Sequence, residues 1–175
     1  QIANQEISLA MEKLKKTFFT SVQILSNLIE MRAPALAGHS RRVADVARHL
    51  AEKMKVPPAE THEILLAGLL HDIGRLVMVA LYPEHYTAVI DQAREQDCCL
   101  RDVEQAVFGY DHAAVGAALA GRWNFPADIV DALAWHHAPE QGVPGGLAAI
   151  IHYADAISQA LDLEETENSQ MPRLH

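Results

Sequence analysis

The chain has 175 residues, of which 50% are hydrophobic, 21% are charged and 6% are aromatic. This length is enough for one substantial hydrophobic core but short for two, so we predict a single domain. The formal net charge of -9 argues against a nucleic-acid polymer as a partner, because a surface that binds one needs Lys and Arg side chains massed on one face.

Two further features of the sequence concern its location. We find no apolar run that approaches the ~20 residues needed to cross a bilayer, and no signal peptide. The two cysteines, Cys98 and Cys99, are adjacent, which disfavours a disulfide between them. These features predict a cytoplasmic protein that is not associated with a membrane.

The first 32 residues have the apolar repeat of one long amphipathic helix. Hydrophobic side chains recur there at intervals of three or four residues, at Ile7, Met11, Leu14, Phe18, Val22, Leu25 and Ile29. Such a helix either packs across its own domain or pairs with a second copy of the chain, and the repeat departs from strict heptads between Phe18 and Val22. We treat residues 1–32 as an N-terminal helix, with signalling or formation of a homodimer as hypotheses for its role.

Residues 33–162 form the predicted helical domain. One helix is predicted to begin near His39 and to end before Pro57-Pro58. The next begins at these prolines and is predicted to run through His71-Asp72 until Gly74 ends it. This assignment places the His-Asp pair in the last turn of a strongly apolar helix.

Prolines, glycines and a capping aspartate delimit the remaining helices. They are predicted to begin at Pro83, to run from Leu100 to Phe108 before Gly109, to begin after Asp111, to run from Pro126 to His136-His137, and to run from Leu147 to Leu161. The acidic segment 163–175 is predicted to be a flexible tail. Since no segment has the alternating pattern of a strand, we predict an all-α helical bundle.

Histidines gather at the predicted helix ends. Of the ten histidines, five lie there or beside turn residues: His39, His71, His112, His136 and His137. Imidazole and carboxylate together suit divalent first-row metals, and a carboxylate such as that of Asp72 can bridge two ions. Metal binding would also offset the cost of burying Asp72 in an apolar helix. Taken singly, each histidine is more often an ordinary core or surface residue, and a bundle whose histidines never meet is an alternative.

Several segments resemble the HD superfamily of metal-dependent phosphohydrolases. Gly38-His39-Ser40-Arg41-Arg42-Val43 and Leu70-His71-Asp72-Ile73-Gly74-Arg75 are similar to motifs of its HD-GYP branch, which hydrolyses cyclic di-GMP. The segments 108–116, 123–126 and 136–139 look more like the HDOD branch, an output domain of bacterial signalling proteins that often lacks metal ligands. The resemblance therefore implies an HD-type helical bundle.

The resemblance also implies a binuclear metal centre. It assigns one ion to His39, His71, Asp72 and Asp155, and the second to Asp72, His112, His136 and His137. Every position of this set is filled, which favours two divalent transition-metal ions, with iron or manganese preferred and zinc, nickel or cobalt as alternatives. Arg75 stands where HD-GYP proteins have a Lys, and Gly142-Val143-Pro144 lacks the tyrosine of the Gly-Tyr-Pro loop.

Two functions are compatible with this site. The first is a phosphodiesterase-type phosphohydrolase in a bacterial signalling protein, acting on a small phosphorylated substrate such as a nucleotide or a cyclic dinucleotide. Asp72 would hold both ions, while Arg42 or Arg75 would orient the phosphate. The alternative is a non-catalytic signalling module, similar to HDOD domains, that binds other signalling proteins.

Overall fold

The computed structural model describes residues 17, 20–21, 24 and 38–170. In this part of the chain every regular element is a helix, as predicted. The elements are α2 (His39–Lys53), α3 (Pro58–Leu70), α4 (Ile73–Leu81), α5 (Pro83–Glu95), α6 (Leu100–Phe108), α7 (His112–Arg122), α8 (Ala127–Trp135), the short 3-10 helix η2 (Pro139–Gln141) and α9 (Leu147–Gln170).

The predicted N-terminal helix, residues 1–32, lies mostly outside the described residues. Its described positions, at residues 17, 20, 21 and 24, are helical, and the Ser21 hydroxyl donates a hydrogen bond to the carbonyl oxygen of Thr17 at 3.0 Å. Whether this segment joins two copies of the chain stays a prediction.

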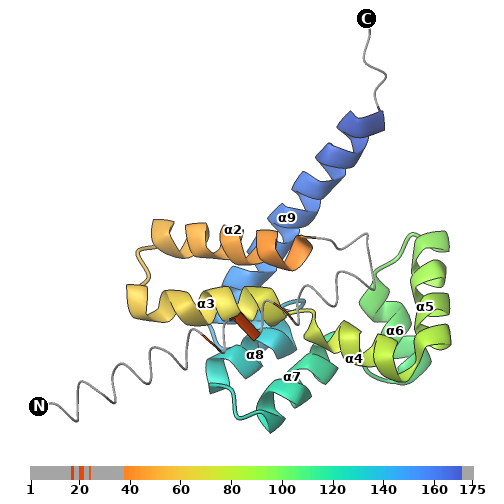
Figure 1. Ribbon diagram of the computed structural model, residues 1–175, viewed down its shortest axis with the longest axis horizontal. Helices are drawn as coiled ribbons and strands as arrows, with labels where there is room; N and C mark the ends of the chain where they lie inside the picture. Colours follow the sequence, from red (N-terminus) through yellow and green to blue (C-terminus); the bar gives the residue numbers. More distant parts are fainter. Residues whose placement is uncertain (1–16, 18–19, 22–23, 25–37, 171–175) are drawn as a thin grey trace, which may run out of the picture.

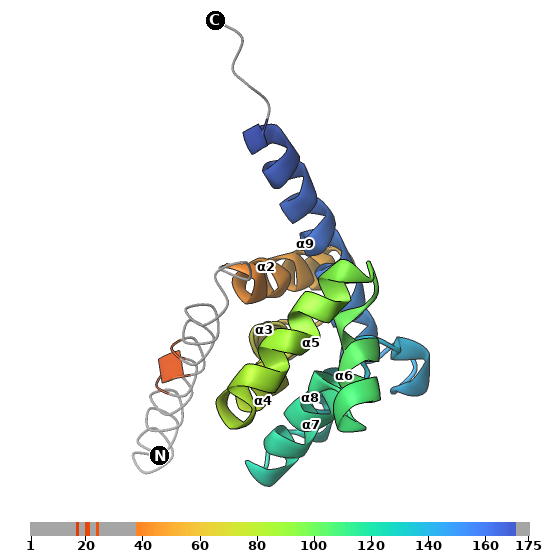
Figure 2. The same ribbon diagram turned by 90° about the vertical axis from the view of Figure 1, so that its right-hand side faces the viewer.

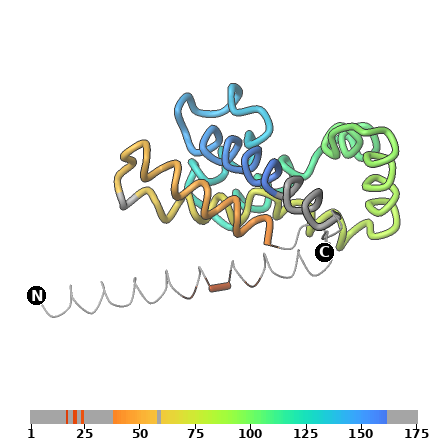
Figure 3. The backbone as a smooth tube through the Cα atoms, turned by 90° about the horizontal axis from the view of Figure 1, so that it is seen from above, coloured from red at the N-terminus to blue at the C-terminus, as the bar shows by residue number. Residues whose placement is uncertain are grey.

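The helices surround two core clusters, both in contact with Leu147, and a smaller side cluster. Helices α2 and α3 run side by side, α9 packs along α2 and α8, and α7 packs on α4 and α8 (Figures 1 and 2). Helices α5 and α6 contact each other at one end of the molecule, away from the start of α3 (Figure 3). This arrangement brings the start of α2, the end of α3, the start of α7 and the end of α8 around a common centre.

Small side chains allow the central helices to approach closely. Ala47 and Ala51 of α2 are fully buried, as are Ala67 of α3 and Ala154 of α9. At Gly68 an added Cβ would lie 2.7 Å from the Cα atom of Ala44, so α2 and α3 touch through their backbones there. Dense packing of this kind fixes the relative positions of the helix ends that carry the histidines.

Several predicted helix boundaries are confirmed. The Asp111 carboxylate accepts a hydrogen bond from the backbone N–H of Ala114 at 2.8 Å and caps α7. Gly109 ends α6 in the left-handed region, at φ 78°. Because of these two signals, His112 is the first residue of α7.

The prediction that Gly74 ends a helix was wrong. Helix α3 ends at Leu70, a turn at His71-Asp72 follows, and the chain enters α4 at Ile73, so Gly74 lies inside a helix that the sequence analysis did not assign. An added Cβ on Gly74 would overlap the carbonyl oxygen of His112 and lie 2.8 Å from the backbone nitrogen of Gly116. Glycine is therefore required by the close contact of α4 with α7.

Two other segments differ from what the sequence predicts, namely the end of α9 and the apolar segment Glu60–Leu81. Helix α9 continues to Gln170, so part of the segment expected as a tail has a helical backbone, while residues 171–175 lie outside the described residues. Among the described residues, the segment Glu60–Leu81 contains an 18-residue window that is apolar enough for a membrane span, with a mean hydropathy of 1.9. Inside the protein, 56% of this window is buried. Such burial is typical of helices in a protein core.

The contact at Gly74 predicts a large effect of a single methyl group. Gly74→Ala is expected to lower the free energy of unfolding by about 1–3 kcal/mol, because the methyl group overlaps backbone that no side-chain rotation can move. Urea unfolding followed by circular dichroism measures this change.

Gly121→Ala, on the neighbouring helix α7, is the matched control. An added Cβ there has nothing within 4 Å, and alanine favours the helix, so stability should rise by about 0.5–1 kcal/mol. Equal unfolding midpoints for the two variants would contradict the proposed role of Gly74.

Candidate metal centre

The structure brings all the residues of the predicted ligand set together. They lie at helix ends or on the inner face of α9: His39 begins α2, His71 and Asp72 join α3 to α4, His112 begins α7, His136 and His137 follow α8, and Asp155 belongs to α9. Neighbouring imidazole rings in this cluster have centroids 4.0 to 5.6 Å apart. The alternative of a bundle whose histidines never meet is therefore wrong.

The cluster contains two groups that could each hold a metal ion. In one group the ligand atoms of His39, His71 and Asp72 lie within 4.8 Å of one another. Asp155 adjoins this group, because its Oδ1 lies 3.0 Å from His39 Nε2. Together with Asp155 this group offers two imidazoles and two carboxylates, which would suit a divalent transition metal.

The second group consists of His112, His136 and His137, whose ligand atoms also lie within 4.8 Å of one another. His112 Nε2 is 2.9 Å from His137 Nε2. Asp72 stands between the two groups: its Oδ2 is 3.4 Å from His71 Nε2, and its Oδ1 is 3.2 Å from His112 Nε2 and 4.0 Å from His136 Nε2. One carboxylate therefore faces both groups.

Backbone carbonyls fix the protonation of two of these imidazoles. Nδ1 of His71 is 2.8 Å from the carbonyl oxygen of Gly68, and Nδ1 of His136 is 2.9 Å from that of Leu133. A carbonyl oxygen can only accept a hydrogen bond, so each Nδ1 carries the proton and donates it. In the neutral imidazole Nε2 is then left with a lone pair, as a metal ligand requires.

Three buried polar atoms of the cluster have no hydrogen-bond partner among the described residues: His71 Nε2, Asp72 Oδ1 and His136 Nε2. Leaving such atoms unsatisfied in a protein interior costs about 1–3 kcal/mol each, and more for a charged group. All three are acceptors, so a cation satisfies them together. The residues present therefore fit a metal centre.

For four of the predicted ligands, the electrostatics favour the protonation states that a metal needs. Burial alone would raise the pKa of Asp72, but Arg75 and the neighbouring imidazoles outweigh it and hold the pKa well below its usual value. Burial lowers the pKa of His71 and His136, and lowers that of His137 to about 4. At neutral pH the carboxylate is charged and these imidazoles are neutral.

Of the two arginines predicted to orient a phosphate, Arg75 contacts the cluster directly, and Arg42 lies on α2 three residues after His39. Arg75 is largely buried, and its Nη1 forms an ion pair with Asp72 Oδ2 at 3.0 Å. Its Nε is buried without a hydrogen-bond partner. Arg42 lies on α2, where its Nη1 would be 2.8 Å from a Cβ added to Gly38, next to His39.

Glu104, a fully buried carboxylate on α6, was not among the predicted site residues. Its Oε2 lies 2.6 Å from His112 Nδ1 and accepts a hydrogen bond from the His112 backbone N–H at 2.9 Å. A signal was present, because position 104 falls on the apolar face of α6 between Leu100 and Phe108. A carboxylate on such a face needs a buried partner.

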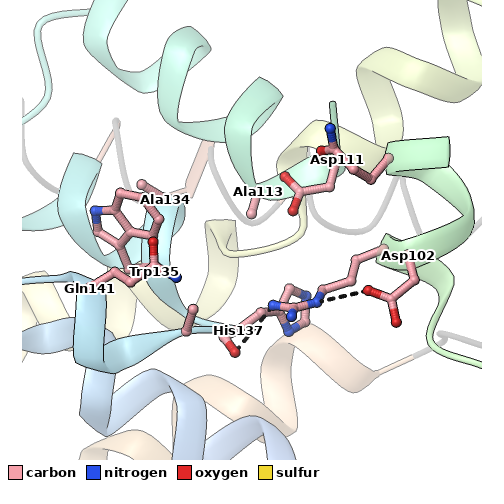
Figure 4. Close-up of a pocket in the computed structure, with 10 residues that line it drawn as sticks. Asp102, Asp111, Ala113, Ala134, Trp135, His137 and Gln141 are labelled. Carbon is pink, nitrogen blue, oxygen red and sulfur yellow. Dashed lines mark hydrogen bonds and ion pairs between the residues drawn. The ribbon is translucent and has the colours of Figure 1, made fainter. Parts of the chain in front are cut away.

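A cavity of about 230 Å³ opens beside His137. His137 is half-buried, whereas the other members of the cluster are buried, and it alone among them lines this cavity (Figure 4). The walls also include Trp135 and Gln141, and Arg101, which donates a hydrogen bond to the carbonyl oxygen of His137 at 3.3 Å. The cavity thus adjoins the second group at His137.

The chain matches a known protein family over most of its length. Residues 8–139 match the model of the HDOD domain. The match ends before α9, so Asp155 lies outside it. Two solved structures are similar: an HDOD domain protein of unknown function from Geobacter sulfurreducens (TM-score 0.66, 27% identity, 74% of this chain and 46% of that one) and a candidate phosphohydrolase from Shewanella amazonensis (TM-score 0.62, 28% identity, 71% and 45%).

Curated relatives are much longer proteins. An uncharacterized protein of Treponema pallidum is 32% identical over 112 residues, which are 62% of this chain and 21% of that protein. Ribonuclease Y of Thermus thermophilus is 32% identical over 122 residues, which are 70% of this chain and 16% of the ribonuclease. The chain therefore corresponds to about a fifth or less of the length of these relatives.

The buried ion pair at the cluster predicts a stability effect. In protein treated with a chelator, Arg75→Met should lower the free energy of unfolding by about 3–5 kcal/mol, because it leaves the Asp72 carboxylate buried without its cation. Urea unfolding measures the loss.

An exposed ion pair supplies the control for this prediction. Arg48 and Glu52 pair at 2.7 Å on the surface of α2, and Arg48→Met should cost no more than about 0.5 kcal/mol. Similar losses in both variants would show that Asp72 does not depend on Arg75.

Proposed function

We propose that this chain, which belongs to the HDOD domain family, has an intact metal centre and hydrolyses a phosphoester. The observation that carries this proposal is the set of three buried acceptor atoms without partners, on His71, Asp72 and His136. A protein that needed only the fold would gain stability by replacing these side chains with apolar ones. Their retention supports a functional site.

The donor set supports a centre with two ions. One would be held by His39, His71, Asp72 and Asp155, and the other by Asp72, His112, His136 and His137, with iron or manganese preferred. Bound divalent ions would lower the pKa of a water molecule and offset the charge that develops on a phosphoryl group. The role of the protein is to hold the neutral imidazoles and the shared carboxylate in place beforehand.

Arginine side chains would hold the phosphate in this proposal. Arg75 uses Nη1 for Asp72, and its buried Nε is a donor without a partner, which favours a contact with a phosphate oxygen. Arg42 lies in the first turn of α2, close in sequence to His39, and is the second proposed contact for the phosphate. Arg75 thus has two roles, in which it neutralises Asp72 and orients the substrate.

The proposed substrate is a small phosphoester such as a nucleotide or a cyclic dinucleotide. The similar proteins include one named a ribonuclease and one described as a candidate phosphohydrolase, and both names concern phosphoester bonds. The cavity beside His137 has a volume of about 230 Å³, below the ~300–1,000 Å³ of most small-molecule sites, and this small size favours a small substrate over a polymer. The net charge of -9 also disfavours a nucleic-acid polymer.

A second candidate function is a signalling module that keeps the ions as structural elements and binds other proteins. The observation that favours it is a group of exposed apolar side chains where α4 and α6 end, at Leu81, Tyr82, Val107 and Tyr110. The rings of Tyr82 and Phe108 lie 5.5 Å apart there. This function predicts bound metal without turnover.

Metal analysis tests the centre directly. Protein purified without a chelator should contain about two divalent ions per chain, and Asp72→Ala should lose them because the carboxylate shared by both groups is removed. His49→Ala is the control, since His49 is exposed and contacts the backbone oxygen of Asp45 on its own helix. Metal-free wild-type protein with an intact fold would refute the proposed centre.

Turnover separates the two candidate functions. With Mn²⁺, or with Fe²⁺ under anaerobic conditions, the wild type should hydrolyse an aryl phosphodiester, and Asp72→Ala should be inactive. Cyclic di-GMP, mononucleotides and a short RNA serve as parallel substrates. Stoichiometric metal without hydrolysis of any of them would favour the signalling module.

A further inference from the structure

Glu104 belongs to none of the ligand positions, yet it has no exposed surface and reaches the centre from α6. Its Oε1 accepts a hydrogen bond from the Tyr86 hydroxyl at 2.5 Å. Its Oε2 faces both the backbone N–H and the ring Nδ1 of His112. A fully buried carboxylate with three donors is a specific arrangement, because each missing donor would leave part of its charge unsolvated.

This arrangement determines which nitrogen of His112 faces the cluster. A charged carboxylate only accepts hydrogen bonds, so Nδ1 of His112 must carry a proton when it lies 2.6 Å from Oε2. In the neutral ring, Nε2 then presents its lone pair beside Asp72 Oδ1 and His137 Nε2, at 3.2 and 2.9 Å. The same result is obtained for His71 and His136 through backbone carbonyls.

The position of His112 explains why it needs a different partner. His71 and His136 donate to carbonyls three residues earlier, at the end of their own helices. His112 is the first residue of α7, so no preceding helical turn offers it a free carbonyl. A side chain from another helix must therefore accept its Nδ1 proton.

We propose that Glu104 is the positioning residue for His112, holding its ring so that Nε2 serves as a metal ligand, and that Tyr86 in turn fixes Glu104. The proposal rests on the metal centre described under the proposed function. A charged acceptor behind an imidazole makes it a stronger ligand than a neutral carbonyl does, so the three-histidine group should be the tighter of the two sites. Burial and the adjacent Glu104 raise the pKa of Tyr86, so its hydroxyl keeps its proton.

The test measures metal affinity and the ring tautomer, neither of which requires turnover. Binding of Co²⁺ or Mn²⁺ to chelator-treated protein is followed by calorimetry, and imidazole ¹⁵N shifts report which nitrogen of His112 is protonated. Glu104→Leu should weaken metal binding at the tighter site by about 10- to 100-fold. In this variant the proton of the His112 ring should no longer be confined to Nδ1. Glu104→Gln, whose amide oxygen can still accept, should keep the tautomer but bind metal less tightly because the charge is lost.

Two controls separate positioning from general effects. Tyr86→Phe keeps both bonds between Glu104 and His112, so its loss of affinity should be smaller than that of Glu104→Leu. Glu84→Gln removes the same charge from an exposed position on α5 and should bind as the wild type does. Thermal unfolding shows whether each variant is folded.

Each outcome decides the proposal. Wild-type affinity in folded Glu104→Leu overturns the positioning role while the metal centre stands. If Glu104→Leu does not fold, wild-type affinity in Glu104→Gln has the same meaning. A wild type that binds no metal overturns the centre and this role together, whereas metal binding that depends on Glu104 without hydrolysis overturns only the proposed reaction.

Discussion

The carboxylate of Asp72, buried between two groups of imidazoles, is the constraint on which the rest of the site depends. A charge in this position must be balanced, and burial lowers the pKa of His71, His136 and His137, so these three imidazoles are neutral and cannot balance it. Within the described residues Arg75 supplies one cationic contact, to a single carboxylate oxygen. The other oxygen faces His112 and His136 and has no hydrogen-bond partner, which is why a metal ion suits this centre better than a further side chain.

The fold meets this constraint by placing functional side chains at helix ends. A helix end leaves backbone groups without partners in the helix, and here the carbonyls of Gly68 and Leu133 orient the imidazoles of His71 and His136. The same device cannot work at the start of a helix, where only N–H groups are free. A carboxylate from α6 takes over that task for His112, so α6 contributes to the centre without supplying a ligand.

Much of this arrangement is visible in the sequence, for local reasons. The cap at Asp111 and the glycine at 109 act through adjacent residues, so their positions predict where α6 ends and α7 begins. The order of histidines and aspartates predicted a ligand set, and the structure brings that set to one place. The assignment of Gly74 failed because a close approach of two helices leaves no local signal that differs from a helix end. Glu104 carries a local signal, its place on an apolar helix face, but its partner His112 lies on another element and could not be identified from that signal.

The contact at Gly74 also bears on how the centre responds to movement. Along this part of the α4–α7 interface main chain meets main chain, at Gly74 and Gly116, instead of interlocking side chains. Side chains can change rotamer and absorb a small shift, but two touching backbones have no such slack. A tilt of α7 relative to α4 would therefore change the distance between Asp72 and His112 directly. This pair of glycines thus makes the ligand geometry depend on how α7 packs on α4.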